Sequence, residues 1–240
     1  MRAGLPHCWM TLTPSLEADR DLKADPGLVE TWVHGWSLTR EVAPPVRDSG
    51  ALRVDVGWPE QKQRYVFDHL SADVQRLAKR IDEPWILIKV CAPWETVQPI
   101  LPSRWVIPAP GFMMSRTLQA SSEPVLPTGY AFDLDSRPPI TVAYIKSANG
   151  EIAASGRLGL VNGSIGRLAV FDRIRTHDDH RRRGLARALM TRLGNIALAD
   201  GVTRAALVAT PDGRLLYSAL GWQLHSLYTT ALIPGPMPAV

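Results

Sequence analysis

The stretch His177-Asp-Asp-His-Arg-Arg-Arg-Gly-Leu-Ala186 joins a strand pattern to a helix pattern. A glycine-containing turn that enters a helix exposes unpaired backbone N–H groups at the positive end of the helix dipole. Such a turn binds phosphate oxygens without side chains, and Gly184 and Ala186 keep the approach sterically open. The arginines at 181, 182, 183 and 187 add positive charge. We therefore expect a polyphosphate site here, with a solvated basic helix start as the alternative.

The patterns on either side of this turn predict a mixed α/β fold. Before it, Asn149-Gly150 and Asn162-Gly163 predict an antiparallel meander with strands over 130–134, 140–146, 152–161 and 165–176. After it, apolar residues at helical spacing predict a helix from 185 that ends at Asp200-Gly201. A strand over 205–210, a short helix over 214–220 and a final strand pair from Gly221 are expected to follow.

Two motifs resemble those of a known family. Arg181-x-x-Gly184-x-Ala186 is similar to the R/Q-x-x-G-x-G/A signature of the GCN5-related N-acetyltransferases (GNAT superfamily), and Leu216-Tyr217-Ser-Ala-Leu-Gly221-Trp222 is similar to their LY-x-x-x-G-F segment. The resemblance covers residues 130–232. It implies that acetyl-CoA lies in a cleft between the strand before the first motif and the strand after its helix.

The resemblance also implies roles for individual residues. The pantetheine arm of acetyl-CoA would run along the strand before the turn, and the pyrophosphate would contact the turn and the helix start. Tyr217 would protonate the departing CoA thiolate, as a phenol with a pKa of ~10 can do. The expected contacts are Ile174, Arg175 and Thr176 for the arm, and Arg181, Arg182, Arg183, Gly184, Leu185, Ala186 and Arg187 for the pyrophosphate.

A candidate general base comes from the chemistry of the acceptor. An amine must lose a proton before it attacks, and a carboxylate can accept that proton, often through water. Asp172 has the same strand parity as Ile174 and Thr176, so we expect it to point into the cleft, with a surface aspartate as the alternative. Asp133 and Asp135, on the opening strand, are weaker candidates.

Charge and tryptophan content divide the chain near residue 120. Residues 1–120 carry 14 Lys+Arg and 14 Asp+Glu, whereas residues 121–240 carry 13 and 9, so the net charge of +4 lies in the second half. Seven of the eight tryptophans lie in the first half. The polar stretch 119–129 contains two prolines and is the best linker candidate. We expect domains at 1–118 and 130–240, joined by this linker.

The first half shows a similar order of elements without the motifs. It is expected to form helices within 15–39, broken near Asp25-Pro26-Gly27, then a hairpin over 51–67 and a helix over 71–81. Strands are expected over 85–90, 105–107 and 112–116. Asp68-His-Leu-Ser-Ala-Asp73 stands where phosphates would need glycine. We therefore expect tandem GNAT-like domains, with residues 1–118 a degenerate copy that binds no CoA.

The second half is incomplete as a GNAT domain, because there is no room between Tyr130 and Ile140 for the two helices that usually follow the first strand. We expect the first half to cover the exposed face and to supply an acceptor wall from Trp32, Trp36 or Trp58. An independent domain on a flexible tether is the alternative.

Together these features predict an acetyl-CoA-dependent N-acetyltransferase. The expected acceptor is the amine of a small molecule, such as an amino acid, a polyamine or an amine antibiotic, and the expected mechanism is direct attack. The first alternative is the same chemistry on a protein lysine or N-terminal amine. The second is a non-catalytic protein that binds CoA or nucleic acid, although no nucleic-acid signature accompanies the arginines.

Composition sets the expected surroundings. Cys8 and Cys91 lie outside metal or disulfide spacings, and His177 and His180 do not form a zinc motif, so no metal is expected. No apolar run reaches the ~18 residues of a membrane helix, and no signal-peptide block precedes the first acidic residues. We expect a cytoplasmic monomer or homodimer with no membrane or nucleic-acid partner.

Overall fold

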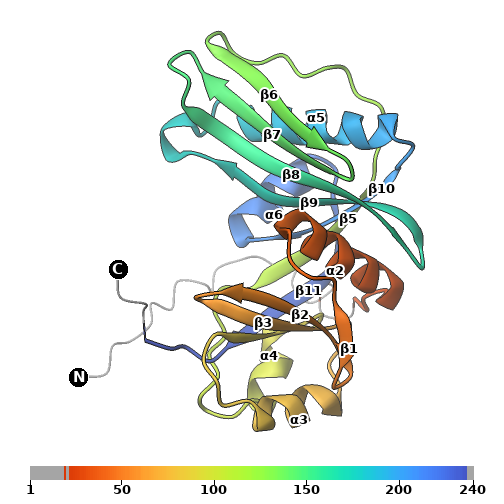
Figure 1. Cartoon of the computed structure of the whole chain (residues 1–240), viewed down its shortest axis with the longest axis vertical. Coiled ribbons are helices and arrows are strands. Elements are labelled where there is room, and N and C mark those ends of the chain that lie inside the picture. Colours follow the sequence, from red (N-terminus) through yellow and green to blue (C-terminus); the bar gives the residue numbers. More distant parts are fainter. Residues whose placement is uncertain (1–18, 20–21, 237–240) are drawn as a thin grey trace.

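A single 11-stranded sheet runs through the molecule (Figure 1). The computed structural model describes residues 19 and 22–236. The sheet order is β1-β2-β3-β4-β11-β5-β10-β9-β8-β7-β6. The strands are β1 (Val46–Asp48), β2 (Ala51–Trp58), β3 (Gln61–Phe67), β4 (Ile86–Val90), β5 (Gly111–Thr117), β6 (Tyr130–Arg137), β7 (Ile140–Ser147), β8 (Ile152–Gly163), β9 (Gly166–Thr176), β10 (Arg204–Ala209) and β11 (Gln223–Leu232). The helices are α2 (Pro26–Arg40), α3 (Ala72–Arg80), α4 (Trp94–Val97), α5 (Leu185–Ala199) and α6 (Pro211–Ala219), with 3-10 turns at Gln98–Ile100 and Asp178–His180.

Most predicted elements are confirmed, and the differences have local causes. Helix α2 begins at Pro26 because the Asp25 side chain caps it, with Oδ1 accepting from Gly27 N at 2.8 Å. The predicted helical segment before residue 22 falls largely outside the described residues. Helix α6 begins earlier than expected, at Pro211, because Thr210 caps it. The predicted strand over 105–107 is reduced to one bridge between Val106 and Leu232.

The prediction of a final strand pair is wrong, because residues 223–232 form one strand that joins the two halves. Strand β11 pairs with β4 on one side and with β5 on the other, both antiparallel. Strand β5 then pairs with β10 over six residue positions. Each half of the chain thus supplies a strand to the sheet of the other. This continuous sheet contradicts the alternative of an independent, tethered first domain.

Helix α2 covers the face of β8 and β9 that lies opposite α5 (Figure 1). Its backbone approaches closely, since a Cβ on Gly35 would lie 2.3 Å from Val170 Cγ2 and one on Gly159 would lie 2.7 Å from Thr39 Cγ2. Trp32 and Trp36 are each 3% exposed and join a core with residues of both halves. The expectation that the first half covers the second is confirmed.

Among the described residues, no helix is both long and apolar enough to cross a bilayer. The three apolar clusters instead fill the spaces between sheet and helices: one beneath α5, one beneath α2 and one beneath α3.

Candidate active site

Among the described strands of the second half, β9 and β10 are the adjacent pair that separates along its length. They pair in parallel only at Ala169–Ala205 and Val170–Ala206. On their other sides both strands stay paired: β9 with β8 as far as Thr176, and β10 with β5 as far as Ala209. Backbone groups of residues 171–176 that face β10 therefore have no strand partner. The gap opens toward α5 and α6, which follow these two strands.

A β-bulge lies on β9 at the start of this gap. The pairing of β8 with β9 shifts register between Ser155 and Arg157, so that Arg173 and Ile174 together oppose Gly156. Arg173 takes a left-handed conformation with φ of +51°. Such a conformation raises the energy of a residue with a side chain, and it occurs more often at active sites and ligand-binding sites than elsewhere. The bulge redirects the side chains that follow it.

The turn into α5 presents six consecutive backbone N–H groups without an acceptor. Within the described residues, none of the amides from 182 to 187 donates to protein, and the first helical bond runs from Ala188 N to Gly184 O at 3.0 Å. Arg182 and Gly184 both have positive φ, at +62° and +76°. A Cβ on Gly184 would meet nothing within 4 Å, so the turn is open. This geometry suits an anion with several oxygens.

The arginines of the turn divide into two kinds. Arg181 pairs with Asp178 at 2.8 Å, and Arg183 donates to the Tyr130 hydroxyl at 2.9 Å, which in turn bonds to His180 Nδ1 at 2.8 Å. These contacts brace the turn. The side chains of Arg182 and Arg187 are exposed and make no such contact with any described residue. They remain available to a ligand.

Tyr217 stands on α6, beside the gap. Its ring lies 6.2 Å from that of Trp222, centroid to centroid, and its side chain is 7% exposed. Burial, followed by the charge of Asp172, raises the pKa of Tyr217 to about 12. Its hydroxyl forms no hydrogen bond with the described residues. The tyrosine therefore keeps its proton at neutral pH and has it free to donate.

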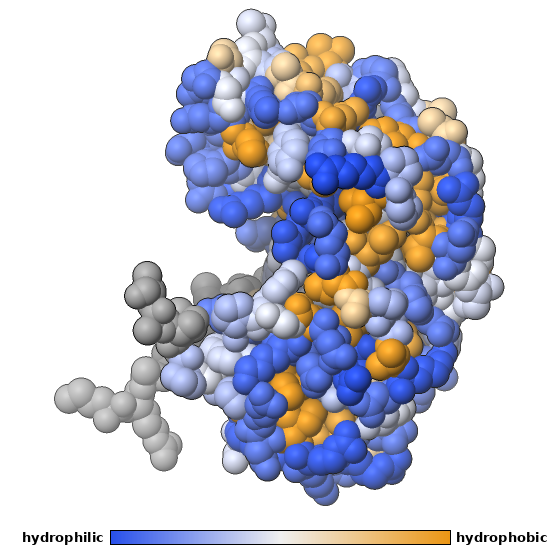
Figure 2. All heavy atoms as spheres, in the orientation of Figure 1, coloured by the Kyte–Doolittle hydropathy of each residue, from blue (hydrophilic) through white to orange (hydrophobic). Residues whose placement is uncertain are grey.

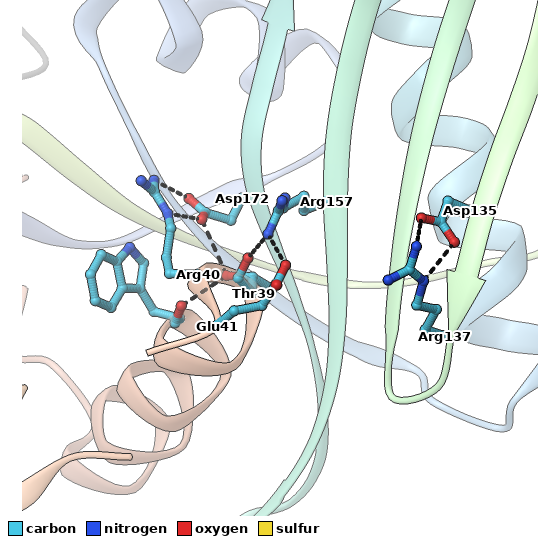
Figure 3. Close-up of polar contacts among 8 residues, drawn as sticks. Thr39, Arg40, Glu41, Asp135, Arg137, Arg157 and Asp172 are labelled. Carbon is cyan, nitrogen blue, oxygen red and sulfur yellow. Dashed lines mark hydrogen bonds and ion pairs between the residues drawn. The ribbon is translucent and has the colours of Figure 1, made fainter. Parts of the chain in front are cut away.

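The prediction that Asp172 and Ile174 point to the same face of the sheet is wrong, because the bulge lies between them. Ile174 packs toward α5, against Leu189 and Leu193. Asp172 instead faces α2, where Arg40 holds both carboxylate oxygens; Arg40 Nη2 donates to Oδ1 at 2.8 Å (Figure 3). The side chains of this pair are 20% and 12% exposed.

The end of α2 is fixed to the second half by the same group of contacts (Figure 3). Thr39 Oγ1 donates to Asp172 Oδ2 at 3.2 Å, and Arg157 Nη1 donates to Thr39 O at 2.6 Å and pairs with Glu41 at 2.8 Å. Asp172 is thus partnered by three donors rather than free in the cleft.

The other predicted carboxylates lie elsewhere. Asp135 pairs with Arg137 at 2.9 Å, in a hairpin apart from the Asp172 group (Figure 3). Asp133 pairs with Lys146 at 2.6 Å on the same exposed edge. Neither is brought to the gap between β9 and β10.

The residues predicted to flank the pantetheine arm lie on the stretch of β9 that pairs with β8 but not with β10. Arg175 is exposed and lines a 290 Å³ cavity with Ser155, His177 and their neighbours on β8. The Thr176 hydroxyl is buried without a hydrogen-bond partner among the described residues. This orphaned donor is consistent with a ligand along the strand.

The described strands of the first half show no such gap. Its parallel strands β3 and β4 pair at five positions, from Gln63–Ile86 to Phe67–Val90. The turn from β3 to α3 contains no glycine, and the Ser71 side chain forms no cap bond. The closed strand pair leaves no room for an extended ligand between these two strands.

Comparison with known proteins agrees with the geometry. Residues 112–222 match the model of the acetyltransferase (GNAT) family. This part of the chain is a GNAT acetyltransferase domain. Its first residue lies in β5, the strand that the sheet order places beside β10. Acetyl-CoA is the acyl donor typical of the family. No curated protein matches the whole chain in a sequence search.

Solved structures show the fold over most of the chain. A GCN5-related N-acetyltransferase from Kribbella flavida superposes with a TM-score of 0.62 at 14% identity, covering 88% of this chain and 97% of its own. An acetyltransferase of the GNAT family from Novosphingobium aromaticivorans gives 0.51 at 16% identity, covering 87% and 97%. A tandem GNAT protein from the clavulanic acid biosynthesis pathway gives 0.50 at 14%, covering 68% of each. The mixed α/β, tandem GNAT-like fold class is therefore confirmed.

Sequence reasoning missed two features beside the candidate site and anticipated a third only in part. Arg40 and the Arg173 bulge depend on pairings between distant residues, and neither carries a local signal. Trp58 was foreseen only as one of several aromatics. In the structure it lies near both arginines, with its ring centroid 5.4 Å from Arg40 Cζ and 5.2 Å from Arg173 Cζ.

Proposed function

We propose that the chain transfers the acetyl group of acetyl-CoA to the amine of a small molecule. The observation that carries this proposal is the opening between β9 and β10, with six free amides at its end. An extended, polyphosphate-bearing thioester fits that combination. The division into a non-binding half over 1–118, a linker over 119–129 and a catalytic half over 130–240 is part of the same proposal.

Donor binding follows from backbone groups. The amides of residues 182–187 would hold the pyrophosphate, and the free edge of β9 would pair with the pantetheine amides in the manner of an added strand. Arg182 and Arg187 are exposed beside the turn and would add charge. The pair of Arg183 with Tyr130 keeps the turn in its open form.

In the chemical step, the amine nitrogen attacks the thioester carbonyl carbon, an N–C bond forms, and the C–S bond breaks. Tyr217 would donate its proton to the departing sulfur, and the proton lost by the amine would leave through water. A pKa of about 12 keeps the phenol protonated. The burial that raises the pKa of Tyr217 would also raise that of the CoA thiol in the same site, so the phenol would not become a weaker acid relative to the thiol that it protonates.

The acceptor would enter from the side that α2 covers. Figure 2 shows the surface hollowed between two lobes, and Figure 1 shows α6 in one lobe and the β2–β3 hairpin in the other. Trp58 is the last residue of β2. The ion pair of Asp172 with Arg40 lies next to Trp58, whose ring centroid is 5.4 Å from Arg40 Cζ. The role of Asp172 as general base stays a prediction. Asp172→Asn tests it: a large fall in kcat with an unchanged Kd for acetyl-CoA in the folded variant would support that role.

Calorimetry with acetyl-CoA on the full chain is the first test. Binding at micromolar to low millimolar concentration is expected, followed by thiol release when a reactive amine is added. No binding at millimolar acetyl-CoA by the folded protein would refute the proposal.

A further inference from the structure

Two cations in the first half lack a carboxylate partner among the described residues. Arg64 on β3 is 7% exposed, and its guanidinium donates to the Gln61 side-chain oxygen at 2.7 and 2.9 Å. Lys89 on β4 is half-buried, and its ammonium donates to Thr230 Oγ1 at 2.8 Å. Both donate only to neutral acceptors, although the carboxylate of Asp172, which Arg40 holds, lies near enough for its charge to act on Arg64. A buried charge without a counter-ion is destabilising, so its presence calls for a ligand.

The sheet register places these cations together beneath α2. Lys89 is directly opposite Val66, which is two residues from Arg64 on the same face. The Arg64 guanidinium lies 3.4 Å from the centroid of the Trp36 ring on α2. Burial lowers the pKa of Arg64 to about 10, and burial, then Arg64 and Arg40, lower that of Lys89 well below its ordinary value. Each cation is thus close enough to oppose the charge of the other.

A third polar group joins them. Tyr228 on β11 is 3% exposed, and its hydroxyl has no hydrogen-bond partner among the described residues. Thr230, the acceptor of Lys89, is two residues along the same strand and shares its face. The charge of Arg64 acts on this hydroxyl. An unpartnered donor beside two cations favours an anion with several acceptor oxygens.

A recess lies at the turn between β2 and β3, beside the start of the strand that carries Arg64. A cavity of 450 Å³ is lined by Trp58, Pro59, Glu60 and Gln61. Gln61 is the residue that bonds to Arg64, and Trp58 contacts both Arg40 and the bulge residue Arg173. The Trp36 and Trp58 rings and the guanidinium groups of Arg40, Arg64 and Arg173 therefore form one continuous row of contacts from the bulge on β9 to Arg64.

We propose that Arg64, Lys89 and the Tyr228 hydroxyl bind a carboxylate of the acceptor, so that the substrate class is an amine that also carries a carboxylate. This inference rests on the proposed acetyltransferase function. A carboxylate offers enough lone pairs for all three donors, and Arg64 can bind it with two parallel bonds. Bound there, it supplies the counter-ion that the two cations lack.

The first experiment compares two acceptor panels with the full chain: the common α-, β- and γ-amino acids, and the same compounds as carboxamides. The proposal predicts at least one amino acid whose kcat/KM exceeds that of its amide by tenfold or more. Without a carboxylate site the amides would be the better substrates, because the amine of the carboxamide loses its proton more readily than that of the amino acid.

The second experiment uses Lys89→Met, with Lys62→Met as the matched control. Lys62 lies on β3 in the same sheet, is 46% exposed and pairs with Glu83. For Lys89→Met we expect at least a tenfold higher KM for the amino acid, an unchanged Kd for acetyl-CoA and a melting temperature equal to or above that of the wild type. For Lys62→Met we expect no change in KM. Arg64→Met provides a second variant if Lys89→Met does not fold.

The outcomes separate the two proposals. Equal or better use of the amides, no acetylated amino acid although acetyl-CoA binds, or an unchanged KM in a folded Lys89→Met variant would overturn the carboxylate site and leave acetyl transfer standing. A lower melting temperature with an unchanged KM would assign Lys89 a structural role. Failure of acetyl-CoA to bind would overturn the proposed function, and this inference with it.

Discussion

The anion-binding turn is tested most sharply by Gly184→Glu. The residue has φ of +76° and open space around its Cβ, so the substitution meets backbone strain of about 1–2 kcal/mol and no clash. A carboxylate at a helix start recovers about 0.3–1 kcal/mol of that through the helix dipole. The variant should therefore fold, with a slightly lower melting temperature.

The loss of affinity can be worked out from charge. With the new carboxylate about 6 Å from the pyrophosphate, each phosphate charge costs about 0.7 kcal/mol in bulk water and about 3 kcal/mol at an effective dielectric constant of 20. Two such charges weaken binding by roughly 1.4 to 5.5 kcal/mol, which is about 10-fold to 10⁴-fold in Kd. Calorimetry with acetyl-CoA measures this directly.

Gly201→Glu is the matched control. Gly201 follows the same helix α5, has φ of +73° and has equally open space. It introduces the same charge and strain at the opposite end, where the helix dipole adds a further cost of about 0.3–1 kcal/mol. We expect this variant to be the less stable of the two and still to bind acetyl-CoA normally. Equal affinity in both folded variants would refute the placement of the pyrophosphate.

Three further changes test other parts of the structure. Tyr217→Phe should leave acetyl-CoA binding intact and lower kcat by about 10²–10⁴-fold; because the pKa of Tyr217 is about 12, its titration should cause no fall in kcat between pH 7 and 10, and a Tyr217-dependent fall in that range would contradict its assignment. Arg40→Met leaves Asp172 without its main partner and should lower the free energy of unfolding by about 2–4 kcal/mol, measured by urea titration; a change below about 0.5 kcal/mol would show that the ion pair contributes little. Residues 119–240 expressed alone should fail to form a stable fold, whereas co-expression with residues 1–118 should restore a soluble complex; a stable, active fragment would disprove the interdependence of the halves.

Local signals were sufficient to locate the turn and the tyrosine that we propose for the acetyl-CoA side of the site. The turn at 181–187 and Tyr217 are defined by short segments whose backbone geometry depends on near neighbours, so motif and structure agree. The same holds for α2, whose start follows from Asp25 and Pro26. These features need no knowledge of which strands are adjacent.

The acceptor side depends on register and could not be obtained in that way. Asp172 and Ile174 point to opposite faces of the sheet because two residues of β9 stand opposite Gly156, which forms a bulge between them. Arg40, the partner of Asp172, is 132 positions away along the chain. Likewise, the alternation of β5 and β11 marks both as strands but does not specify their neighbours. Long-range pairing decides each of these points.

The exchange of β5 and β11 has a consequence for how the chain acquires its structure. The first half cannot complete its sheet until β11, the last strand in chain order, has been synthesised, and β5 remains without either neighbour until β10 and β11 exist. Domain-by-domain folding during synthesis is therefore blocked, and both halves must assemble together in one late step. Such non-local pairing makes folding slow and leaves apolar strand edges exposed to aggregation in the meantime. We therefore expect the yield of folded protein to depend on how well these strand edges are protected during synthesis.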